Sequence, residues 1–135
     1  MIKYVKEAFL DVCKNSLGGE ATIREDEHLH RGFVAKIDVK RDSDLPIVFI
    51  CSDPFLKEAA NIMLFEENPD FDTLKDIACE IANLCVGRAK VIAEGDNEHF
   101  DISTPEFLKH GDYSGGGQKV SFMFDHKSCT VIIGG

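Results

Sequence analysis

The chain has 135 residues, of which 44% are hydrophobic and 29% are charged, and its formal net charge is −9. These amounts fit one globular domain over residues 1–135 with a single apolar core. Nucleic-acid binding needs a basic field that displaces counterions from phosphates, and anionic lipid surfaces attract positive charge. The acidic balance therefore argues against nucleic acid and against a membrane surface as partners.

The N-terminal sequence and the cysteines favour the cytoplasm. Residues 1–11 lack the unbroken apolar segment and the cleavage site of a signal peptide, and no other segment approaches the length that spans a membrane. The five cysteines are odd in number and form no Cys-x-x-Cys pair, which suits reduced thiols. We expect a cytoplasmic protein whose cysteines are mostly small core residues.

The first half of the chain predicts two helices and three strands. Apolar residues at helical spacing predict a helix over 2–15, which Gly18-Gly19 ends. A short strand is expected over 21–24, a half-buried strand with alternating apolar residues over 32–39, and a third strand over 47–51 after a turn at 41–46. Ser52 and Pro54 supply a capping side chain and a proline for the first turn of a helix that continues to about Leu64.

The second half predicts one long helix and three more strands. The helix is expected from Asp72 or Thr73 to about Glu94, and Gly95-Asp-Asn ends it. A short strand follows over 100–102, residues 106–118 are expected to be mostly loop, and residues 119–124 and 129–133 form a hairpin. The whole pattern predicts an α+β fold in which three helices pack on a mainly antiparallel six-stranded sheet.

The long helix carries a polar row that a core helix does not need. Steps of four and three residues place its members on one face; this polar row consists of Asp76, Glu80, Asn83, Gly87, Lys90 and Glu94. Apolar residues fall mainly on the other side, namely Ile77, Ala78, Ile81, Leu84, Cys85 and Val91. The helix can therefore bury one side and present a carboxylate and a carboxamide one turn apart to solvent or to a partner.

Gly87 is unusual in the interior of a predicted helix, because glycine lowers helix stability by roughly 1 kcal/mol relative to alanine. The missing side chain, one turn after Asn83, can leave room for the backbone of another molecule. Alternatively, it lets a neighbouring strand of this same chain approach closely. Both interpretations fit the sequence.

The spacing Asp76-x-x-x-Glu80-x-x-Asn83, followed by the run Gly-Arg-Ala-Lys at 87–90, resembles the signature helix of the CheC/CheX/FliY phosphatases of bacterial chemotaxis. A single copy of the motif in a short chain is most similar to CheX. A second Glu-x-x-Asn at Glu58 and Asn61 lacks both the preceding acidic residue and the small-residue run, so we interpret it as a chance match. The resemblance implies a CheX-like fold.

The same resemblance implies a phosphatase that acts on the phospho-aspartate of a CheY-like response regulator. Asn83 would orient the attacking water, and Glu80 would dock on the lysine in the regulator's active site. Asp76 would support the helix face or contact the partner, and Gly87 and Lys90 would contact the partner. Phosphoryl transfer responds mainly to positioning and electrostatics. The regulator would supply its own Mg²⁺, so the chain would need no cofactor or metal of its own.

Two other functions stay open. A non-catalytic module could use the same helix to bind and sequester a response regulator, and a scaffold could keep the fold without such a partner. The resemblance also implies a homodimer formed through the sheets. The apolar strand over 129–133 would be hazardous as a free edge, which a second copy could cover, but it can equally lie in the middle of its own sheet.

The remaining candidate sites are weaker. His28 and His30 could hold a metal from one strand face, but without a third ligand nearby they are more often solvated side chains. The glycines at 115–117 lack the spacing of a phosphate-binding loop and fit a flexible loop better. No cysteine or serine comes with an identifiable base and orienting group.

Overall fold

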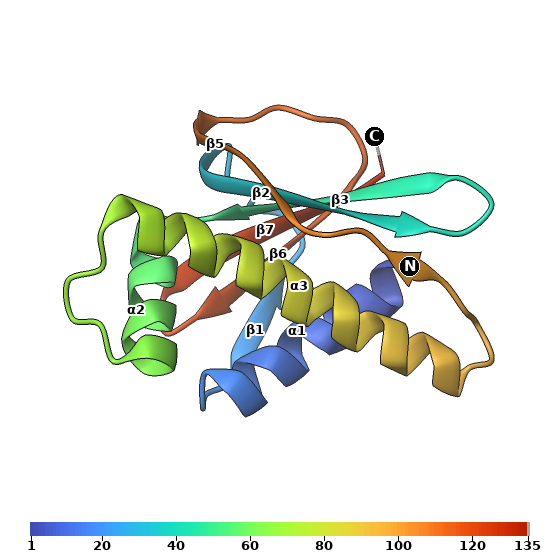
Figure 1. The fold of residues 1–135 in the computed structure, drawn as a ribbon, viewed down its shortest axis with the longest axis horizontal. Coiled ribbons are helices and arrows are strands. Elements are labelled where there is room, and N and C mark those ends of the chain that lie inside the picture. Colours follow the sequence, from blue (N-terminus) through green and yellow to red (C-terminus); the bar gives the residue numbers. More distant parts are fainter. Residues whose placement is uncertain (135) are drawn as a thin grey trace.

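A computed structural model describes residues 1–134 and shows three helices and seven strands (Figure 1). The elements follow each other along the chain as α1 (Ile2–Ser16), β1 (Ala21–Arg24), β2 (Arg31–Lys40), β3 (Asp44–Cys51), α2 (Asp53–Leu64), α3 (Phe71–Gly95), β4 (Asp101–Ile102), β5 (Glu106–Asp112), β6 (Gln118–Phe124) and β7 (Lys127–Ile133).

Local capping groups determine where the second and third helices begin. The Ser52 hydroxyl accepts a hydrogen bond from the backbone N–H of Phe55 at 3.2 Å, as the sequence predicts. The Asp70 carboxylate accepts one from the N–H of Thr73 at 2.8 Å, so α3 begins before the predicted Asp72 or Thr73. Hydrogen bonding from Thr73 also lowers the pKa of the Asp70 carboxyl.

The seven strands form one sheet in which every pair is antiparallel. The strand order is β1-β6-β7-β3-β2-β4, and β5 pairs with β2 beside β4. The sheet separates two apolar clusters. The large one lies between the sheet and the three helices, and the small one, on the opposite face, contains Val34, Val48, Ile50 and Ile132.

The predicted α+β architecture with three helices on an antiparallel sheet is confirmed, but the number of strands is wrong. Residues 106–112, predicted to be loop, form β5. The sequence of this segment does not show the alternation of apolar and polar residues that identifies a strand. Glu106, Lys109 and His110 are exposed, and Phe107 and Leu108 are its only large apolar residues. Its strand conformation comes from pairing with β2, about 75 residues earlier in the chain, as Gly32 opposite Gly111 shows.

The predicted hairpin at the end of the chain is confirmed, and its position in the sheet answers a question that the sequence left open. The turn residues Asp125 and His126 both have positive φ, 48° and 63°, as a two-residue type I′ turn requires. Strand β7 lies between β6 and β3. It is therefore a central strand, and the idea that residues 129–133 form a free edge is wrong.

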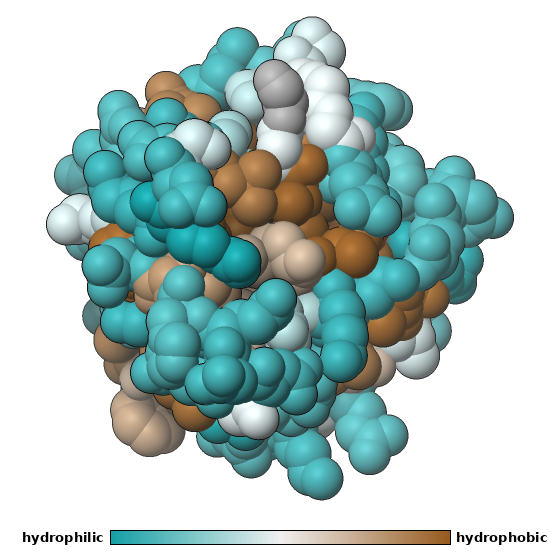
Figure 2. Space-filling model, turned by 90° about the vertical axis from the view of Figure 1, so that its right-hand side faces the viewer, coloured by the Kyte–Doolittle hydropathy of each residue, from teal (hydrophilic) through white to brown (hydrophobic). Residues whose placement is uncertain are grey.

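Both chain ends lie toward the same side of the molecule, and a hollow lies near the first residues (Figures 1 and 2). Its lining is mixed, with Met1, Val39 and Leu45 beside the polar or charged Arg41, Asp42, Ser43 and Glu98. Figure 2 shows a brown patch within a largely hydrophilic surface. No helix in residues 1–134 is both long and apolar enough to cross a bilayer.

Candidate functional site

The candidate site lies on α3, the longest helix, which crosses in front of the sheet in Figure 1. Nine of its residues are buried against the sheet and α1: Leu74, Ile77, Ala78, Ile81, Ala82, Cys85, Val86, Ala89 and Ala93. Several are alanines, whose small side chains let the helix lie close to the sheet. This buried side fixes the direction in which the opposite side of α3 points.

The opposite side of α3 presents the predicted polar row to solvent. Asp76, Glu80 and Asn83 are exposed, and Gly87 and Lys90 are partly buried. No side-chain hydrogen bond or ion pair within residues 1–134 engages the side chains of Asp76, Glu80 or Asn83. The helix rises about 4.5 Å between Glu80 and Asn83, so the acid and the amide lie side by side and are free to bind another molecule.

Gly87 borders open space. A Cβ atom built at this position has no heavy atom within 4 Å outside its own stretch of helix. The alternative in which a strand of the same chain packs closely on Gly87 is therefore wrong. The gap at Gly87 remains available to a partner.

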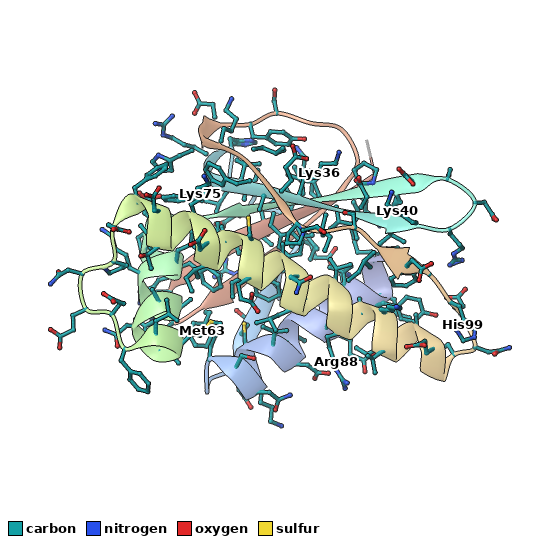
Figure 3. All side chains as sticks on the ribbon, viewed as in Figure 1. Lys36, Lys40, Met63, Lys75, Arg88 and His99 are labelled. Atoms are coloured by element: carbon teal, nitrogen blue, oxygen red, sulfur yellow. The ribbon has the colours of Figure 1, made fainter. Side chains whose placement is uncertain are left out.

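Two side-chain contacts flank α3 and add to its buried side, which fixes the rotation of the helix about its axis. On one side the Arg88 guanidinium pairs with Asp11 of α1 at 3.0 Å. On the other side the Lys75 ammonium lies 5.4 Å from the centre of the Phe107 ring of β5. Figure 3 shows Lys75 and Arg88 leaving α3 on opposite sides.

Lys90 differs from the other predicted partner-binding residues because it has a partner within the chain. Its ammonium lies 3.8 Å from a carboxylate oxygen of Asp101 in β4, and its side chain is 37% exposed. Such a contact is weak and easily exchanged in water. Lys90 can therefore support α3 and still reach a docked molecule.

The sequence placed one residue of α3 on the wrong side. Val91, predicted to face the core, is 54% exposed. The helical spacing could have predicted this exposure. Val91 comes four residues after Gly87, so its side chain leaves the helix only about 40° around the axis from Gly87. Gly87 and Val91 thus form a continuous surface next to Asn83, with an apolar side chain beside the gap.

Cys79, which precedes Glu80, is not an activated nucleophile. Burial raises the pKa of its thiol, and the nearby carboxylate of Asp76 raises it further. The thiol is therefore protonated at neutral pH. The exposed groups that the site offers are a carboxylate and an amide, which can bind and position but cannot attack.

The histidines that the sequence considered for metal binding have a different setting. His28 Nδ1 lies 2.8 Å from the Ser121 hydroxyl, on the sheet face away from the helices. Within residues 1–134 no group of three or more His, Cys, Asp or Glu side chains is arranged to hold a metal ion.

The second Glu-x-x-Asn copy lies on α2 in a different environment. Glu58 is 3.9 Å from the Lys127 ammonium, while Asn61 is exposed near the end of the helix. The copy has the same spacing, without the preceding acidic residue and without the glycine gap. It provides a matched internal control for experiments on Glu80 and Asn83.

Solved structures with the same fold come from several bacteria. A chemotaxis protein CheX from Vibrio vulnificus aligns with a TM-score of 0.82 at 18% identity, covering 98% of this chain and 94% of that one. A chemotactic CheC-like protein from Shewanella oneidensis gives 0.76 at 18% identity, with 98% and 95% coverage. A CheX-CheY-BeF3-Mg²⁺ complex from Borrelia burgdorferi gives 0.75 at 19% identity, with 98% and 96% coverage.

No curated protein sequence matches this chain closely enough to count as a relative. The profile of one family, described as chemotaxis phosphatase CheX, matches residues 33–125. The match covers more than half of the chain and includes the whole of α3 with its exposed acid and amide. The chain therefore belongs to the CheX family of chemotaxis phosphatases.

Proposed function

We propose that this chain is a phosphatase that hydrolyses the phospho-aspartate of a CheY-like response regulator. The observation that carries the proposal is the pair formed by Glu80 and Asn83. Both side chains are exposed on a helix whose other side is buried, and within residues 1–134 neither has a side-chain hydrogen bond or an ion pair. Polar groups held this rigidly and left free are suited to a partner molecule.

The proposed chemistry needs little from this chain. An acyl phosphate is already activated, and transfer through a loose transition state depends mainly on positioning and charge. The Asn83 amide hydrogen-bonds the attacking water and holds it in line with the bond that breaks. The partner supplies Mg²⁺ and a lysine to neutralise the transferring group. In the Borrelia complex, the structural neighbour is bound with CheY, BeF3 and Mg²⁺.

Glu80 anchors the complex in this proposal. A carboxylate that pairs with the lysine of the regulator inside a protein interface forms a charge-assisted contact, which fixes the register of docking. The surrounding surface completes the contact. Gly87 allows close approach, while Asp76 and Lys90 lie on either side of the central pair.

The decisive experiment compares acyl-phosphate decay on the cognate regulator with wild type, Glu80→Ala, Asn83→Ala and the control Asn61→Ala. Asn83→Ala is expected to retain binding and to lower dephosphorylation by about 10²-fold or more, as the loss of a key positioning group does. Glu80→Ala is expected to weaken binding. Asn61→Ala, with the same spacing on α2, is expected to behave as wild type.

The experiment also separates the phosphatase from a module that only sequesters a regulator. Both require Glu80 for docking, but only the phosphatase requires Asn83. Wild-type protein that binds the phosphorylated regulator without shortening its lifetime would support the sequestering module. Protein that binds no phosphorylated regulator would support the scaffold.

We also propose that the chain acts in the cytoplasm as a homodimer. The self-association rests on the resemblance to CheX and on the open edges of the sheet. Strand β1 has β6 on one side and, within residues 1–134, no strand on the other, so its backbone groups can pair with a second copy. Sedimentation velocity measures the mass in solution, and a monomer at all concentrations would contradict this part of the proposal.

A further inference from the structure

The loop between α2 and α3, residues 65–70, carries an aromatic side chain that the fold does not use. Phe65 is 89% exposed, and the neighbouring Leu64 at the end of α2 is 50% exposed. The other large aromatic nearby, Phe71, packs against Phe33 and Phe107. Phe65 thus presents apolar surface to water, which costs free energy unless another molecule covers it.

The backbone makes this choice of residue more unusual. Phe65 has φ 58° and ψ 30°, the left-handed conformation, at the C-terminal cap of α2. Its N–H donates to the carbonyl of Asn61, and the N–H of Glu66 donates to that of Ala60. This cap position favours glycine or asparagine, because a Cβ atom is strained there. A phenylalanine is unfavourable for the fold in both conformation and exposure.

The charges around Phe65 indicate what could cover it. Glu66, Glu67, Asp70 and Asp72 are all exposed, and no lysine or arginine occurs between residues 64 and 74. An apolar side chain within such a negative field complements an apolar pocket with a basic rim. It does not complement an anionic membrane or a nucleic acid, which would be repelled.

We propose that this loop is a second docking point for the response regulator, with Phe65 as the apolar anchor and the acidic residues as the rim. This inference rests on the proposed function. The loop leads directly into α3, and the helix rises about 18 Å from Phe71 to Asn83. A standard interface of about 800 Å² per partner is roughly 30 Å across. The rise along α3 does not include the loop itself, but Phe65 caps α2, which packs beside α3 on the same face of the sheet (Figure 1). We therefore expect one regulator bound over this face to reach both Phe65 and Asn83.

The test measures binding of the cell's own chemotaxis response regulator, loaded with BeF3⁻ and Mg²⁺, by calorimetry. Phe65→Asn is expected to raise Kd about tenfold or more, as truncation of a buried aromatic anchor does. The same change is expected to leave Tm unchanged or higher, because asparagine tolerates the left-handed conformation. The control Met123→Asn removes a partly exposed apolar side chain from the opposite face of the sheet and is expected to leave Kd within about twofold.

A second variant tests the loop without changing Phe65. The charge reversal E66K/E67K is expected to weaken binding and to reduce its dependence on salt, because rim charges act through the screened field. An unchanged Kd for either loop variant, or an equal loss in Met123→Asn, would overturn the proposed docking point. If the loop variants leave Kd unchanged but Asn83→Ala still blocks dephosphorylation, the proposed phosphatase activity is retained and only the docking role of the loop is refuted. If the wild type binds no loaded regulator, both proposals fail.

Discussion

Replacement of Gly87 should separate the stability of the fold from the docking of a partner. Glycine in a helix interior costs about 1 kcal/mol relative to alanine, and a Cβ atom at residue 87 meets no heavy atom within 4 Å. Gly87→Ala is therefore expected to stabilise the chain by about 1 kcal/mol. For a domain of this size that free energy corresponds to a rise in Tm of about 3–5 °C.

A larger side chain at the same position should leave the fold intact and obstruct the partner. The leucine of Gly87→Leu extends into open space beside Asn83, so it fills the gap that the proposed docking requires. We expect a normal Tm and a loss of regulator binding of about tenfold or more, because extra methylenes forced into a closely packed contact cost about 1–3 kcal/mol in protein cores and about 1.4 kcal/mol is a tenfold change in Kd. Circular dichroism during heating gives Tm, and acyl-phosphate decay at several protein concentrations gives the apparent affinity.

The matched control is a second glycine of α3. Gly95, the last residue of the helix, also has no heavy atom within 4 Å of a built Cβ, but it lies two turns beyond Gly87. Gly95→Leu is expected to dephosphorylate the regulator at the wild-type rate. Wild-type activity in Gly87→Leu would refute the docking role of the gap, and a lower Tm in Gly87→Ala would reveal a packing constraint on this residue.

Two further predictions concern the interior. Thr130→Val is expected to lower the free energy of unfolding, measured in urea, by about 1–3 kcal/mol. The buried Thr130 hydroxyl accepts a hydrogen bond from the N–H of Leu29 at 2.8 Å and shares another with the Ser121 hydroxyl at 2.7 Å. An unchanged free energy of unfolding would mean that water replaces the hydroxyl in the variant. A thiol reagent at neutral pH is expected to modify only Cys79 in the native protein, because the other four cysteines are buried; burial raises the pKa of Cys13, for example, to about 12. The reaction of Cys79 is expected to be slow because the pKa of its thiol is also raised. Rapid labelling of more than one thiol, counted by mass spectrometry, would contradict it.

The helices could be predicted from the sequence because their determinants are local. The Ser52 cap, the Pro54 first turn and the apolar periodicity all lie within one element, and the observed bounds differ from the predicted ones by only one or two residues. The polar row on α3 could be predicted for the same reason. Val91 was misplaced although its spacing from Gly87 already put it on the exposed side.

The sheet was harder to predict because its determinants are distant in sequence. Strand β5 has few apolar residues and becomes a strand by pairing with β2, an interaction that no local pattern reveals. The central position of β7 likewise depends on its pairing with β3 as well as with β6. A predicted hairpin identifies the strand that pairs on one side of β7, but it does not identify the strand that pairs on the other side.

The positioning of Asn83 depends on this distant part of the fold. An amide that orients water must be held within about 0.5 Å and 20° of its productive geometry. On α3 that constraint comes from the buried neighbours Ala82 and Val86, which pack against the core, and the partly exposed Arg88–Asp11 pair adds a weaker contact at the side. The chemical groups of the site can therefore be identified from seventeen residues of one helix, 71–87. The rigidity that the proposed chemistry requires comes from packing against α1 and the sheet. A peptide containing α3 alone would carry the same side chains without that support.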